Sequence, residues 1–170
     1  DFSGMIKSIE GPETCNTYNM LKLTKEIYAD SPNSSYIDYY EKALYNHILS
    51  SQNSKTGGYV YFTPMRPGHY RVYSQPETSF WCCVGSGMEN HSKYGEMIYA
   101  HSNNDLYVNL FIPSKVTWAE KKVVLTQENN FPDTCVHKYQ WQQNRFGKLY
   151  FHRAGNKPDA SFLYDGGGID

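Results

Sequence analysis

Apolar side chains recur at about every third or fourth position in the first part of the chain, which is the spacing of an amphipathic helix. One such stretch spans residues 14–29, with Thr14 or Asn16 as the candidate N-cap. A second spans residues 36–49, after the turn-forming segment 30–35. The pattern predicts two consecutive helices joined by a short connection. The apolar stripe of the first helix contains Tyr18, Met20, Leu21, Leu23, Ile27 and Tyr28.

The segment between residues 50 and 79 carries little helical signal. Only the run 59–62, which follows two glycines, predicts a short strand, and the remainder predicts a long loop. Loops of this length inside a compact domain are usually functional. A third helix is predicted over residues 87–99, with Met88 and His91 on its inner face; His91 is either a core histidine or a group that faces a cleft.

The hydrophobic period changes from helical to alternating near residue 103. Residues 106–112 and 121–127 predict strands. We therefore expect a helical domain over 1–102, the start of a β domain over 103–133, and a tail over 134–170 without a clear period. The predicted fold class is mainly α with a β-rich C-terminal part.

Composition and charge exclude several kinds of partner. The 170 residues carry a net charge of −1 and no basic run, which argues against nucleic acid and anionic membranes. No apolar run approaches the roughly 20 residues of a membrane-spanning helix, so a soluble protein is predicted, and its compartment stays open. The aromatic content of 16% suits either a sugar-binding cleft or a tyrosine-rich core.

Two of the four cysteines, Cys82 and Cys83, are adjacent, and a disulfide between neighbours would be strained. Upstream, Glu13 and Cys15 offer a carboxylate and a further thiol. Three thiols and a carboxylate are the number and type of donors that Zn²⁺ prefers. We expect the fold to bring these four residues together, and Cys135 to lie apart from them.

The residue types leave three interpretations of this set open. It forms a closed structural zinc site, a catalytic metal–thiolate centre, or a group of buried cysteines without a metal. Zinc keeps a bound thiol ionised at neutral pH, so a ligand thiolate can also act as a nucleophile. An oxidoreductase is disfavoured because the chain has no Cys-x-x-Cys motif.

Two runs of the sequence resemble glycoside hydrolase family 127, the β-L-arabinofuranosidase family. They are GPETCNTYNMLKLT at residues 11–24 and FWCCVGSGMENH at residues 80–91, and YEKALYN at residues 40–46 is similar as well. The resemblance covers about residues 1–133, and the combination of Glu-Thr-Cys with Cys-Cys is its most specific part.

The resemblance implies the C-terminal part of an (α/α)6 barrel followed by the beginning of a β-sandwich. It also implies Zn²⁺ held by Glu13, Cys15, Cys82 and Cys83, with Cys82 as the nucleophile of a retaining glycosidase. Glu41 matches a glutamate that binds sugar hydroxyls in the family; a solvated charge on the helix is the alternative. The implied substrates are plant-type glycans that contain arabinose.

One departure from the family pattern concerns the general acid/base. The family's acid/base glutamate lies further upstream of the Glu-Thr-Cys motif than this chain extends, and Glu10 is too close to Glu13 to match it. We therefore expect the chain to be a fragment that is inactive by itself. The competing hypothesis is a zinc-stabilised carbohydrate-binding or structural module without turnover.

Overall fold

The computed structural model describes residues 3–130, 133, 137–142 and 148–151, and it contains both helices and sheets. The chain divides into two compact units, Asp1–Tyr94 and Gly95–Asp170. Within the described residues, every helix is too short or too polar to cross a membrane. The mixed helical and β content agrees with the predicted class, whereas the barrel, the sandwich and the predicted domain limits remain predictions.

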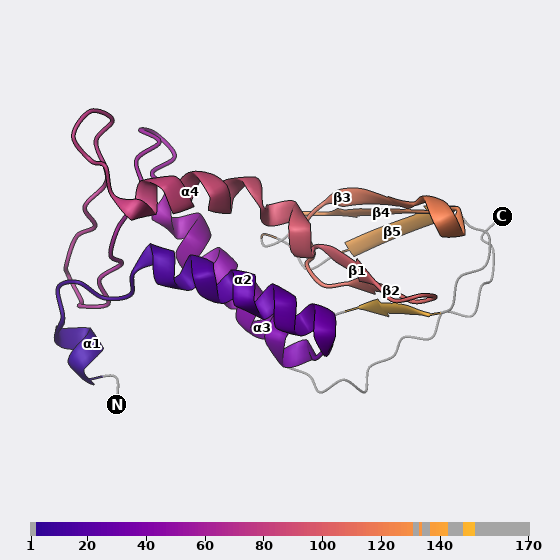
Figure 1. Ribbon diagram of the computed structural model, residues 1–170. Helices are drawn as coiled ribbons and strands as arrows, with labels where there is room; N and C mark the ends of the chain where they lie inside the picture. Colours follow the sequence, from indigo (N-terminus) through magenta and orange to yellow (C-terminus); the bar gives the residue numbers. More distant parts are fainter. Residues whose placement is uncertain (1–2, 131–132, 134–136, 143–147, 152–170) are drawn as a thin grey trace. The chain divides into compact units, whose positions relative to one another are not determined.

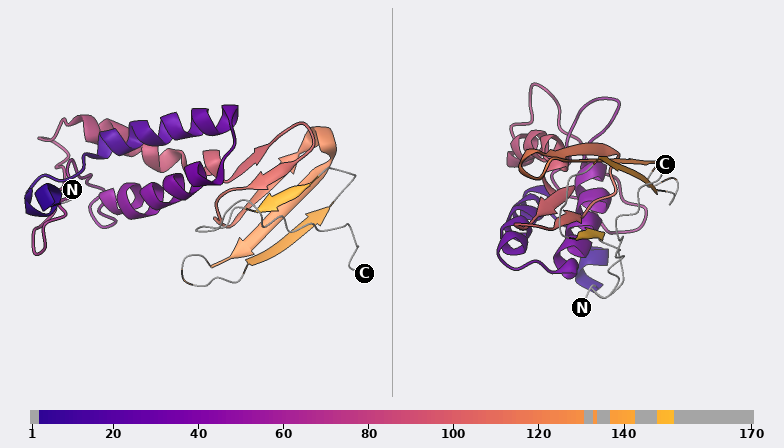
Figure 2. Two further views of the ribbon diagram at one scale, coloured as in Figure 1. Left: turned by 90° about the horizontal axis from the view of Figure 1, so that it is seen from below. Right: turned by 90° about the vertical axis from the view of Figure 1, so that its right-hand side faces the viewer.

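The first unit contains the helices α1 (Ser3–Lys7), α2 (Thr14–Asp30), α3 (Ser34–Ala43) and α4 (Cys82–Ser92) (Figure 1). Helix α2 contacts both α3 and α4. The connection between α2 and α3 is short, so the two helices run antiparallel, as the sequence predicted (Figure 2). The shorter helical turns of this unit are η1 (Leu44–Ile48) and η2 (Leu49–Ser51), and a further turn, η3 (Tyr94–Met97), begins at its last residue.

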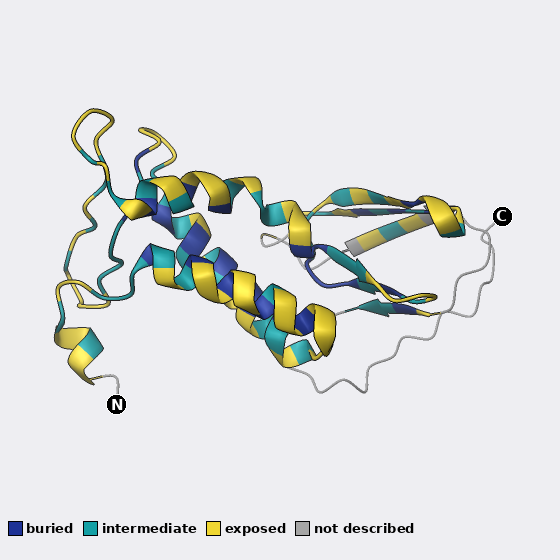
Figure 3. Cartoon of the chain, in the orientation of Figure 1, coloured by how far each residue is buried: buried dark blue, intermediate teal, exposed yellow. Residues whose placement is uncertain are grey.

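The apolar stripe of α2 is narrower than predicted. Tyr18, Leu21 and Tyr28 are buried, together with Ile37 and Tyr40 of α3. The other apolar residues of the predicted stripe lie on the exposed side of the helix (Figure 3). Only part of a helix turns toward its neighbours, so a stripe that is broad in sequence exceeds the packed face. These exposed residues are Met20, Leu23 and Ile27.

The second helix begins at Ser34, two residues before the predicted start at residue 36, and its last turns are not α-helical. The side chain of Asn33 accepts a hydrogen bond from the backbone N–H of Ser35 at 2.9 Å, so α3 begins with a side-chain cap. After Ala43 the helix continues as the π-helical turn η1 and ends in η2. Leu44 and Ile48 of η1 are buried, so the apolar side of the helix continues through this change.

The long loop between η2 and α4 lies against the start of α2. It forms isolated bridges, among them Glu13 with Phe62, rather than the predicted strand over 59–62. The predicted N-cap of α2 is also wrong: Glu13 is the capping residue, in extended backbone geometry and without a side-chain cap bond. The buried hydroxyl of Thr14 instead donates to the carbonyl oxygen of Val60 at 2.7 Å.

Helix α4 begins at the cysteine pair and ends at Ser92, whereas the sequence predicted a helix over 87–99. Gly85 and Gly87 both lie inside this helix. Met88 is exposed, which also contradicts its predicted inner position. A Cβ added at Gly87 would lie 2.6 Å from a ring carbon of Tyr59. The glycine is therefore there for close packing, not for a turn.

We expect Gly87→Ala to destabilise the first unit by about 1–3 kcal/mol, because the new methyl group must displace the Tyr59 ring. The matched control is Gly85→Ala in the same helix, where an added Cβ meets nothing within 4 Å. The control should leave the unit unchanged or stabilise it by up to about 1 kcal/mol. Urea titration followed by the helical circular dichroism signal compares the two; equal effects would contradict the packing role of Gly87.

The second unit contains two small sheets. One has the order β1 (Tyr99–His101), β2 (Leu106–Val108), β6 (Leu149–Phe151), with an antiparallel and then a parallel pairing. In the other, β3 (Ser114–Trp118), β4 (Val123–Asn129) and β5 (His137–Gln142) are antiparallel. A 3-10 turn, η4 (Ala119–Lys121), joins β3 to β4. Residues of both sheets share one core: Leu106, Val108, Trp118, Val123, Leu125 and Leu149.

The strand predicted over 106–112 stops at Val108. The fully buried side-chain amide of Gln127, on β4, donates to the carbonyl oxygens of Leu110 at 3.0 Å and Ile112 at 2.7 Å. These carbonyl groups therefore bond to a side chain rather than to a neighbouring strand. Strands β5 and β6 fall within residues 134–170, for which the sequence showed no clear period.

Candidate metal centre

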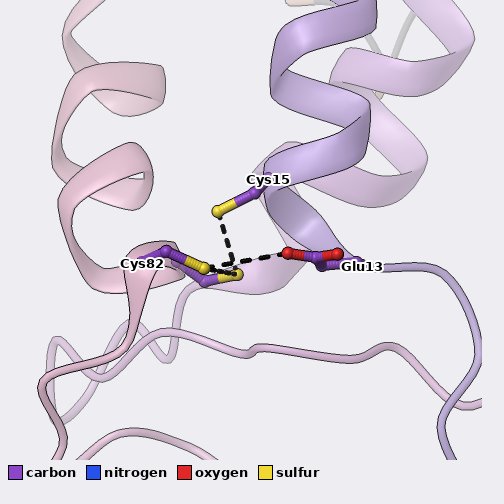
Figure 4. Close-up of side chains that lie close together, drawn as sticks. Glu13, Cys15 and Cys82 are labelled. Atoms are coloured by element: carbon purple, nitrogen blue, oxygen red, sulfur yellow. Dashed lines mark hydrogen bonds between the residues drawn. The ribbon is translucent and has the colours of Figure 1, made fainter.

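The N-terminal ends of α2 and α4 bring together the four residues that the sequence singled out (Figure 4). Glu13 precedes the first residue of α2, and Cys15 is the second residue of that helix. Cys82 and Cys83 are the first two residues of α4. One ligand atom from each of the four side chains lies within 4.8 Å of all the others.

The separations between these atoms suit a small tetrahedral ion. The Sγ atom of Cys83 lies 3.2 Å from that of Cys15 and 3.8 Å from that of Cys82. The Sγ atom of Cys82 lies 3.7 Å from Oε1 of Glu13. Tetrahedral zinc with bonds of about 2.0–2.3 Å holds its ligand atoms roughly 3.3–3.8 Å apart. The separations of Cys82 from Cys83 and from Glu13 fall within this range, and that between Cys15 and Cys83 is slightly shorter. The three cysteines are free thiols, so the donor set fits the metal chemically as well.

The two helix starts explain how such close sequence neighbours share one site. Glu13 has extended backbone angles (φ −80°, ψ 134°), while Cys15 is already helical, within the helix predicted over residues 14–29. Successive residues of a helix are rotated by about 100° around its axis, yet the Sγ atoms of Cys82 and Cys83 lie 3.8 Å apart at the start of α4. Cys83 is fully buried and Cys82 is exposed.

Without a cation, the site favours neutral thiols. Burial and the hydrogen bond to Cys15 raise the pKa of Cys83 far above its ordinary value. Burial also raises the pKa of Cys15. Both thiols need a nearby positive charge to ionise at neutral pH, and a bound divalent cation supplies one. The positive ends of the α2 and α4 dipoles add a smaller contribution of the same sign.

The side chains of Ser86 and Tyr61 also adjoin the cluster, although the sequence did not point to either of them as part of it. The hydroxyl of Ser86 lies 3.1 Å from the Sγ atom of Cys15. A hydrogen bond to Cys82, together with the electrostatic interaction between the two groups, raises the pKa of Tyr61 to about 12. Ser86 lies one helical turn after Cys82, so a helix predicted to begin at the cysteines would have identified it; Tyr61 has no comparable local signal.

Glu41 lies on α3 and is not part of this cluster. It is buried, so the alternative of a solvated helix charge is wrong. Burial raises the pKa of its carboxyl group, and Oε1 has no hydrogen-bond partner among the described residues. A buried carboxylate oxygen without a partner is uncommon in proteins. The role of Glu41 in binding sugar hydroxyls remains a prediction.

His91 packs inside the first unit. Its ring stacks on Tyr59 with a centroid distance of 5.7 Å, and its Nδ1 lies 2.5 Å from the hydroxyl of Tyr94. Burial lowers the pKa of His91. These contacts support the interpretation of His91 as a core histidine. Cys135, which was expected to lie apart from the cluster, falls outside the described residues.

Family models match both parts of the chain. Residues 4–96 match the catalytic domain of GH127 β-L-arabinofuranosidases, and residues 105–152 match the middle domain of the same enzymes. The second match extends past residue 133, where the resemblance in sequence was expected to end. No curated protein matches the chain.

Solved structures of longer proteins have a similar fold. A GH127 β-L-arabinofuranosidase from Geobacillus stearothermophilus T6 matches with a TM-score of 0.70 and 19% identity, over 87% of this chain and 26% of that one. A structure described as a glycoside hydrolase matches with a TM-score of 0.67 and 19% identity, over 85% and 27%. A GH127 β-arabinofuranosidase matches with a TM-score of 0.58 and 25% identity, over 74% and 21%.

This chain thus spans about a quarter of the length of the solved structures that it matches. The catalytic-domain match covers more than half of its residues and includes the Glu-Thr-Cys and Cys-Cys motifs. The chain therefore belongs to glycoside hydrolase family 127, the β-L-arabinofuranosidase family.

Proposed function

We propose that this chain carries the zinc and nucleophile part of a retaining β-L-arabinofuranosidase that acts on arabinofuranose-containing plant glycans. The observation that carries the proposal is the set of four donor atoms within 4.8 Å, at the start of two helices that the catalytic-domain model covers. Zn²⁺ would be held by Glu13, Cys15, Cys82 and Cys83. When bound, it supplies the positive charge that keeps thiols ionised near neutral pH.

Cys82 is the best placed of the three thiols to attack a substrate. Its side chain is exposed, whereas Cys83 is fully buried and Cys15 is partly buried between Cys83 and Ser86. A nucleophile must reach the anomeric carbon, so only the exposed sulfur can approach a sugar without moving a helix. The buried sulfurs serve better as permanent ligands.

The reaction then takes two steps. The Cys82 sulfur forms a bond to the anomeric carbon while the bond to the leaving oxygen breaks, and a general acid protonates that oxygen. Water next attacks the same carbon, loses a proton to a general base and releases the Cys82 sulfur. Two displacements at one carbon retain its configuration. The thiolate thus replaces the second carboxylate that most retaining glycosidases use.

The competing candidate is a zinc-stabilised carbohydrate-binding or structural module. The observation in its favour is the number of ligands, because four protein donors fill a tetrahedral zinc site and catalytic zinc usually keeps an open position. Four protein ligands do not exclude catalysis by Cys82. A zinc ligand that is itself the nucleophile does not require an open position on the metal.

The activity is tested with p-nitrophenyl β-L-arabinofuranoside. We expect the complete natural protein that contains these residues to hydrolyse it with retention, which nuclear magnetic resonance of the first product reveals. We expect the 170-residue chain alone to be inactive. If the complete, zinc-loaded protein binds arabinofuranosides without turnover, the module without catalysis is the correct reading. Hydrolysis by the chain alone would contradict its expected inactivity.

A further inference from the structure

We propose that Ser86 is a positioning residue of the metal centre, whose hydroxyl donates a hydrogen bond to the thiolate of Cys15. The inference rests on the proposed zinc site and deepens it. The Oγ atom of Ser86 lies 3.1 Å from the Sγ atom of Cys15, on the other helix. The contact therefore joins the start of α4 to the start of α2, at the point where the ligands meet.

Helical spacing explains why Ser86 can reach this position. It follows Cys82 by four residues and Cys83 by three, so it lies on the same face of α4 as the cysteine pair. The next residue, Gly87, packs directly against the ring of Tyr59, which fixes the position of this turn. The Ser86 side chain is thereby presented to Cys15 by a part of α4 that has little room to shift.

A second serine on the same helix shows what a serine hydroxyl usually does there. Ser92 donates to the carbonyl oxygen of Glu89 at 2.7 Å, which is an ordinary bond to the preceding turn. The hydroxyl of Ser86 instead contacts a sulfur atom 71 residues earlier in the sequence. Its contact is thus a tertiary interaction with a ligand atom, not a local property of serine in a helix.

The chemistry of a metal-bound thiolate sets the direction of the bond. A thiolate has no proton, so the hydroxyl must be the donor, and a hydrogen bond to a charged acceptor is stronger than one between neutral groups. Such a bond orients the Cys15 sulfur toward the shared position. Removal of outer partners of metal ligands typically weakens metal binding by about 10–100-fold.

The experiment compares variants of the full 170-residue chain in zinc and cobalt titrations. We expect Ser86→Ala to bind zinc about 10–100-fold more weakly against a competing chelator. We also expect a shift of the thiolate-to-cobalt charge-transfer band, which a purely structural effect on folding would not cause. Ser92→Ala is the matched control, because it removes a hydroxyl from the same helix, and it should leave both measurements unchanged.

Ser86→Thr keeps the hydroxyl and should bind zinc as the unmodified chain does. If Ser86→Ala matches the unmodified chain in zinc affinity and cobalt spectrum, the proposed role of Ser86 is wrong, and the proposed metal site is unaffected. An equal loss in Ser86→Thr and Ser86→Ala would also overturn it, because packing rather than the hydroxyl would then matter. If the unmodified chain binds neither metal, the proposed zinc site itself fails, and Ser86 loses its role with it.

Discussion

Replacement of Cys83 with alanine is expected to abolish tight zinc binding and to remove the stability that the metal gives to the first unit. Cys83 is the fully buried ligand and lies closest to Cys15. Alanine leaves the site with two thiols and a carboxylate. A metal that binds only the folded state at a thousand times its Kd stabilises it by about 4 kcal/mol, and that contribution should disappear.

The measurement is urea unfolding of the zinc-loaded chain, with and without a chelator, together with the bound zinc content. The chelator should destabilise the unmodified chain and have no effect on Cys83→Ala. Cys135→Ala is the control, since the sequence places that thiol outside the ligand set, and it should retain zinc. If the chelator leaves the unmodified chain equally stable, a structural contribution of zinc is excluded.

The pKa shifts set the pH dependence of the same experiment. In the metal-free chain, burial raises the pKa values of Cys15 and Cys83, so their protonated forms are favoured in the folded state. The stability that these protonated thiols contribute to the folded state is present below the ordinary thiol pKa and is lost as the pH rises through the raised pKa values. Zinc must displace these protons, so its affinity should fall as the pH is lowered.

Replacement of Cys82 with serine is expected to remove catalysis while the fold remains. A serine hydroxyl is not ionised near neutral pH, and loss of a nucleophile in a hydrolase can lower kcat by roughly 10⁴-fold or more. The side chain is exposed, so the substitution creates no cavity in the core. The complete natural protein should lose turnover of the aryl arabinofuranoside, with an unchanged circular dichroism spectrum.

This variant separates the two proposed functions. If the centre is only structural, Cys82→Ser should lose zinc and stability together, as Cys83→Ala does. If Cys82 is the nucleophile, its substitution should affect activity far more than unfolding. Full activity in Cys82→Ser would exclude the nucleophilic role of this residue, whatever its effect on zinc.

Much of the first unit follows from local pattern. The spacing of apolar residues predicted the end of α2 to within one residue. This was possible because the buried side of a helix is formed by residues three or four positions apart in the sequence. The type of the four donors likewise predicted a metal site before any distance was known. The start of the third helix was wrong: the pattern predicts a helix from residue 87, yet α4 begins at Cys82.

What the sequence by itself determined is the family, the ligand types and the order of helices before strands, since each depends on residue identity or local spacing. Only the tertiary structure decided which atoms meet. Cys15 and Cys83 are 68 positions apart, and their 3.2 Å separation depends on how α2 packs against α4. The burial of Cys83, the exposure of Cys82 and the contact of Ser86 with Cys15 have the same origin, because a periodic pattern contains no information about distances between helices.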